Sequence, residues 1–203
     1  MKKTFAYIAT FFVLYSVFVI ALMPASWLMA QIKLPANVSI TPVEGTIWHA
    51  SVKQVMVDGV VINQVKSHLS LVSVLMLDPK LDVTFGDPLI NGPEGQLTIS
   101  GLRSDITIKD ARVSLAANTV AARLNLPIDI IAHEQLTLNV SHFVMGAPIC
   151  GELQGDVAWR SAAVSAFDEK VKLGNLSAAL SCEKGELIAE IAPNNDLGLS
   201  YRA

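Results

Sequence analysis

The chain has 203 residues and a formal net charge of -3, with 52% hydrophobic but only 16% charged residues, whereas soluble domains usually carry about 25% charge. The length suits one ordinary domain with a small additional element. A nucleic-acid partner is not expected, because no cluster of lysine and arginine occurs beyond Lys2 and Lys3.

Residues 1–30 predict a short cytoplasmic stub and a transmembrane anchor. No charged residue occurs between Lys3 and Lys33, and a spanning helix needs roughly 20 mostly apolar residues. The two N-terminal lysines keep the N-terminus in the cytoplasm by the positive-inside rule. A cleaved signal peptide is the alternative, but its best cut, after Ala30, places Leu28 where a small residue is required. A buried core helix would show a polar stripe, which is missing here.

Residues 31–203 predict a β-rich domain on the far side of that membrane, in the periplasm. Apolar and polar residues alternate with period two in several short segments, which is typical of strands with one buried and one wet face. Dipeptides such as Asp58-Gly59 and Lys184-Gly185, together with Gly95, indicate turns between strands. The clearest alternation occurs at 81–85, 97–99, 106–108, 136–140 and 187–191.

Two segments interrupt the strand pattern. Residues 67–77 place Leu69, Val72, Leu75 and Met76 at helical spacing, and residues 116–124 also predict a short helix. Each helix is expected to plug an end or edge of the sheet. The predicted fold class is therefore all-β: a curved or twisted antiparallel sheet with one or two short helices, preceded by a single N-terminal transmembrane helix.

Two cysteines occur, Cys150 and Cys182. An even number of cysteines in an exported domain favours a disulfide between them. The alternative is two separate buried thiols. No Cys-x-x-Cys motif is present, so redox chemistry of the thioredoxin kind is not indicated.

The residues nominate no catalytic site, no metal site and no cofactor. The histidines are His49, His68, His133 and His142, and His133-Glu134 lacks the second histidine of a zinc-protease motif. No nucleophile elbow, phosphate-binding loop or dinucleotide-binding glycine motif occurs. A non-enzymatic protein is therefore expected.

Two segments that contain tryptophan stand out, 43–48 and 151–159. A glycine before a strand that leads to tryptophan most often means a turn followed by a core aromatic residue. The functional interpretation is a membrane-proximal rim for a partner or for lipid. Trp48 and Trp27 are the candidates for that rim, because Trp27 follows the apolar segment, where an indole suits the membrane interface.

Over nearly its whole length, the chain resembles the N protein family of the bacterial type II secretion pathway. The resemblance rests on the order and spacing of several segments rather than on any single one. They are Leu22-Met23-Pro24-Ala25-Ser26-Trp27, Leu34-Pro35, Gly45-Thr46-Ile47-Trp48, the apolar helix around 69–76, Leu81-Asp82-Val83-Thr84-Phe85-Gly86 and the region from Cys150 through Trp159 to Cys182.

This resemblance implies an inner-membrane accessory or scaffold component of the type II secretion system, involved in secretion across the outer membrane. Its expected partners are other components of that system in the inner membrane and periplasm, with membrane lipid contacted through the anchor. Family members are expected to run some tens of residues longer. The layout also looks, more loosely, like that of AsmA-like proteins, and the alternative function is therefore a periplasmic groove that binds lipid or another hydrophobe.

Overall fold

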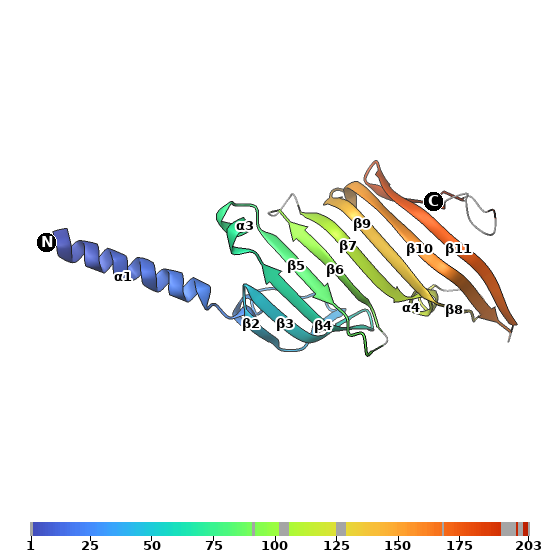
Figure 1. Ribbon diagram of the computed structural model, residues 1–203, viewed down its shortest axis with the longest axis horizontal. Helices are drawn as coiled ribbons and strands as arrows, with labels where there is room; N and C mark the ends of the chain where they lie inside the picture. Colours follow the sequence, from blue (N-terminus) through green and yellow to red (C-terminus); the bar gives the residue numbers. More distant parts are fainter. Residues whose placement is uncertain are drawn as a thin grey trace.

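The computed structural model describes residues 2–90, 92–101, 106–124, 129–167, 169–191, 198 and 201–202. These residues form one sheet of 13 strands, in which the paired strands run antiparallel. The predicted all-β class and antiparallel sheet are confirmed. Figure 1 shows the strands side by side in a single twisted layer, with the first helix extending from one end.

The strand order follows the chain order almost throughout. The main path is β1-β3-β4-β5-β6-β7-β9-β10-β11-β12-β13, with β2 beside β3 and β8 beside β10. The strands are β1 (Val38–Ile40), β2 (Val43–Thr46), β3 (His49–Val57), β4 (Val60–Leu69), β5 (Lys80–Phe85), β6 (Glu94–Ser100), β7 (Thr107–Ala116), β8 (Ile131–His133), β9 (Gln135–Met145), β10 (Cys150–Ala166), β11 (Glu169–Glu183), β12 (Glu186–Ile191) and β13 (Tyr201–Arg202).

Tight turns give the sheet its meandering order. Val57 pairs with Val60, so Asp58 and Gly59 alone connect β3 to β4, with φ angles of 49° and 79°. Lys184 and Gly185 connect β11 to β12 in the same way. A two-residue hairpin turn with both φ angles positive matches the right-handed twist of the flanking strands. The turns predicted at these two dipeptides are therefore confirmed.

Gly95 is a correction, because it lies within β6 instead of in a turn. A Cβ atom on Gly95 would collide with the backbone oxygen of Arg112 on the neighbouring strand and would lie 3.0 Å from the ring of Phe85. The glycine is therefore required for close packing against a strand and an aromatic ring, which the sequence does not distinguish from a turn.

Two helices precede the sheet, α1 (Lys2–Ala21) and α2 (Ala25–Met29). Figure 1 shows α1 projecting away from the sheet on the side of β2 and β3. Across the described residues, no helix has both the length and the apolarity required to cross a membrane. The transmembrane helix expected from the sequence is therefore not confirmed.

The two helices within the sheet region, α3 (Leu71–Leu75) and α4 (Ala117–Ala121), lie at strand ends. α4 follows β7 inside the segment predicted for it. α3 is shorter than the predicted 67–77, because β4 continues to Leu69. The helix was also expected to plug an end or edge of the sheet with its apolar side chains. Instead, most of its apolar residues and the residue after it are exposed, namely Leu71, Val72, Leu75 and Met76.

Candidate functional site

One face of the sheet is apolar across most of its strands. Residues paired directly across antiparallel strands share a face, so the register of neighbouring strands defines rows of residues that cross the sheet. One row passes through Leu69, Leu81, Ile99, Ile108, Phe143 and Leu153. A second row passes through Phe85, Gly95, Val113, Leu138, Val157, Ala178 and Ile191. We call the face that carries both rows the apolar face.

The side chains of the apolar face are only partly covered. Every residue in the two rows is half-buried. The buried hydrophobic residues in the described part of the chain are instead mostly alanines, together with Trp48 and Cys150. Full burial of one leucine or phenylalanine side chain is worth about 1.5–3 kcal/mol, so a sheet normally packs such a face against a second layer. No second layer covers the apolar face within the residues that the structure describes.

The apolar face is hollowed near its C-terminal strands. The hollow has a volume of about 200 Å³, and its lining includes Leu136, Trp159 and Leu176. The indole Nε1 of Trp159 donates a hydrogen bond to the backbone oxygen of His133 over 2.8 Å. This bond satisfies the polar atom of Trp159 and leaves apolar ring surface at the hollow.

The opposite face is polar. One of its rows passes through His49, His68, Asp82, Thr98, Lys109, His142, Gln154 and Ser181. On this face Thr98 donates to Asp82 over 2.7 Å, and Asn139 donates to Asp156 over 3.0 Å. The sheet therefore has one face suited to water and one suited to an apolar contact.

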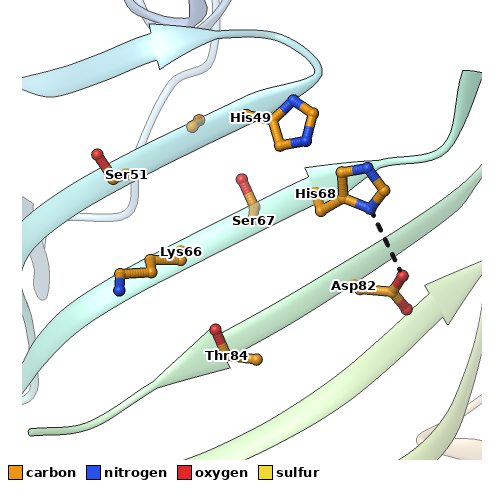
Figure 2. A pocket seen from close by; sticks show the side chains of 8 residues that line it. His49, Ser51, Lys66, Ser67, His68, Asp82 and Thr84 are labelled. Atoms are coloured by element: carbon orange, nitrogen blue, oxygen red, sulfur yellow. Dashed lines mark ion pairs between the residues drawn. The ribbon is translucent and has the colours of Figure 1, made fainter.

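The strongest cluster of chemically active side chains lies on the polar face (Figure 2). The rings of His49 and His68 lie 4.5 Å apart, and His68 Nδ1 lies 3.9 Å from Asp82 Oδ2. They border a shallow hollow of about 310 Å³. The side chains of His68 and Asp82 are about half exposed, and 3.9 Å exceeds hydrogen-bond distance.

This arrangement gives the histidines no oriented acid–base partner of the kind that nucleophilic catalysis requires. No group of three histidine, cysteine, aspartate or glutamate residues in the described ranges is placed to hold a metal ion. His133 and His142 lie apart from this pair, in β8 and β9. His133 Nε2 lies 2.7 Å from the Ser165 hydroxyl oxygen, and His142 Nε2 lies 3.5 Å from Glu152 Oε2.

The two tryptophans expected at a membrane-proximal rim have different surroundings. Trp48 is only 8% exposed, and its Nε1 donates to the backbone oxygen of Ile20 in α1 over 3.2 Å. Trp27 in α2 is 53% exposed. Trp27 therefore presents its ring to the surroundings, whereas a partner could reach the ring of Trp48 only after the contact with α1 opened.

A disulfide joins Cys150 at the start of β10 to Cys182 near the end of β11, with the two Cα atoms 6.2 Å apart. The backbone N–H groups of Ile149 and Cys150 both donate to Gly185, in the turn that follows β11. The bond and these contacts tie the loop between β9 and β10 to the β11–β12 turn.

Comparison with known proteins identifies the family. The family model described as "Type II secretion system (T2SS), protein N" matches residues 36–203, which is most of the chain. The chain belongs to the type II secretion system protein N family.

Individual relatives agree with this assignment. Type II secretion system protein N of Aeromonas hydrophila is 28% identical over 199 residues, which cover 97% of this chain and 78% of the relative. The protein of the same name from Vibrio cholerae serotype O1 is 24% identical over 206 residues, which cover 98% and 82%. No solved structure matches the chain.

The family assignment confirms the resemblance seen in the sequence. The order and spacing of segments that carried the resemblance did not, however, reveal the apolar face. Each row that defines the apolar face takes one residue from every strand that it crosses. Their period-two alternation was visible in the sequence. The sequence gives no signal that the described residues lack a second layer. Apolar and polar residues alternate along a strand in the same way whether or not its apolar face is covered.

Proposed function

We propose that this protein N family member is a non-enzymatic accessory component of the type II secretion system that holds other components against the apolar face of its sheet. The uncovered apolar face is the observation that carries the proposal. Monomeric soluble proteins rarely expose a large continuous apolar surface, and such a surface usually marks a site for a protein or a membrane. The names of the matched relatives place those proteins in a secretion system.

We also propose that α1 tethers the chain to the inner membrane, with the sheet in the periplasm. Apolar side chains from Tyr7 to Leu22 along α1 and the turn after it are mostly exposed, and no charged residue occurs between Lys3 and Lys33. Such a surface is unfavourable in water. A mature N-terminus near Gln31 would contradict a retained tether.

The tether and the sheet together support a scaffold. Confining the domain to the membrane surface raises its effective concentration for other membrane-bound components. The two apolar rows together cross eight neighbouring strands, from β4 to β12 along the main path, and neighbouring strands are about 4.8 Å apart, so the apolar rows extend over about 34 Å. Its outer strands additionally offer backbone groups to which a partner strand can pair.

The second candidate function is a groove for lipid or another hydrophobe, as in the AsmA-like alternative. The same uncovered face favours it, and the apolar hollow beside Trp159 is a specific seat for part of such a ligand. Ligand sites of this kind are lined mainly by hydrophobic and aromatic side chains. The scaffold and the groove use the same apolar face. They differ in what occupies that face, a protein or a lipid.

Crosslinking in cells from the two faces separates these possibilities. A photo-crosslinking amino acid replaces Leu138 on the apolar face or, as the control, its neighbour Thr137 on the polar face. The scaffold function predicts adducts with another secretion component from position 138 and few from 137. Lipid adducts from position 138 would favour the groove. Absence of adducts from position 138, or equal protein adducts from both positions, would contradict the use of this face.

A further inference from the structure

The short helix α3 has an inverted polarity. Its serine is buried, with Ser73 only 7% exposed, whereas Leu75 and Leu77 are 82% and 81% exposed. Leu71, Val72 and Met76 are also exposed. A surface helix of a soluble protein has the opposite pattern, with apolar residues facing the core.

Hydrogen bonds hold α3 in this orientation. The Ser73 hydroxyl donates to the backbone oxygen of Ser70 over 2.7 Å and accepts from the backbone N–H of Lys80, at the start of β5, over 2.9 Å. The Ser70 hydroxyl in turn caps the helix by accepting from the N–H of Ser73. Because Ser73 ties the helix to β5, the leucines on the other side face away from the sheet.

The exposed patch of α3 lies at the same end of the sheet as α1. The backbone N–H of Leu69, two residues before α3, donates to the oxygen of Trp48 over 2.9 Å. Trp48 is bonded to Ile20 of α1, and the N–H of Ile47 donates to the oxygen of Met23. Figure 1 shows α3 on the side of the sheet that faces α1.

The chemistry of the patch fits lipid better than protein. No charged residue occurs from Leu69 to Leu77, whereas His68 precedes this segment and Asp78 and Lys80 follow it. The exposed residues of α3 and its end are leucine, valine and methionine, without the tryptophan, tyrosine or arginine that typically dominate protein–protein binding energy. Exposed Trp27 and Leu28 of α2 add a second apolar contact beside α1.

We propose that α3 is a second membrane contact, which inserts its leucines at the boundary between lipid headgroups and acyl chains. The inference rests on the proposed tether, since α1 brings the bilayer surface to this end of the sheet. Apolar side chains buried at that boundary bind a membrane in proportion to their area. Two contacts with the bilayer, through α1 and through α3, fix the direction in which the sheet leaves the membrane more firmly than α1 alone.

The experiment uses the full chain in phosphatidylcholine vesicles whose acyl chains carry bromine, which quenches tryptophan fluorescence on contact. The variant Leu75→Trp places an indole on α3. The control Leu89→Trp uses a residue that is 92% exposed in the loop after β5, near the other ends of these strands. Emission is measured relative to the parent chain, which contains three tryptophans.

We expect the emission added by Leu75→Trp to be largely quenched and the emission added by Leu89→Trp to be retained. Equal quenching of the two, or none at position 75, would overturn the membrane contact of α3. Flotation of the vesicles separates this failure from failure of the tether. If the parent chain does not float with the vesicles, then the tether fails, and the inference that rests on it fails too.

Discussion

Trp48 connects α1 to the sheet at the level of a single residue. Its indole is bonded to Ile20, and its backbone oxygen accepts from Leu69 of β4. From the sequence, this residue has two interpretations, a core aromatic residue after a turn or a rim residue for a partner. Its burial agrees with the first, whereas partner binding through Trp48 stays a prediction.

The first prediction concerns this connection. Trp48→Phe removes the indole N–H and some volume while it keeps an aromatic ring, so the free energy of unfolding should fall by about 1–3 kcal/mol. Trp27→Phe should change it by less than about 0.5 kcal/mol, because Trp27 is exposed. Denaturant unfolding in detergent, followed by circular dichroism, gives both values. An unchanged stability of Trp48→Phe would show that the bond to Ile20 does not stabilise the fold.

Strands were more predictable than helices at the level of elements. The alternation at 81–85 and 136–140 identified β5 and β9, because side chains on a strand alternate between its two faces. The helical spacing of Leu69, Val72 and Leu75 identified a helix near the right place but predicted that its leucines would be covered. The hydrogen bond that the backbone N–H of Lys80 donates to the Ser73 hydroxyl decided the orientation. Lys80 belongs to β5, which the local pattern does not include.

The second prediction belongs to the scale of elements and concerns the disulfide. It closes a loop between residues 32 positions apart, and a loop of that length is worth about 2–4 kcal/mol. Cys150→Ala with Cys182→Ala should therefore lower the free energy of unfolding by about that amount. Each single substitution should cost a similar amount, since either one breaks the same bond. Additive losses from the two single changes would contradict a shared bond, as would no loss at all.

At the scale of the whole molecule, the decisive feature is a sheet whose apolar face is not covered by a second layer among the described residues. The sequence predicted an antiparallel sheet, but not that it would form a single extended layer. Length and composition fit a two-layer domain equally well, because both have the same proportion of apolar residues. Only the strand order, β1 to β13 nearly in sequence, shows that the residues described by the structure do not fold back over the apolar face.

The central claim is that another component of the secretion system covers the apolar face in the cell. Carbene footprinting, which labels any accessible side chain, tests it directly on membranes that contain this chain alone and on membranes that contain the complete secretion system. We expect Leu138, Phe143 and Val157 to be labelled in the first and protected in the second, whereas Thr137 and Asn139 on the polar face are labelled equally in both. Equal labelling of the apolar face in both membranes would contradict the claim.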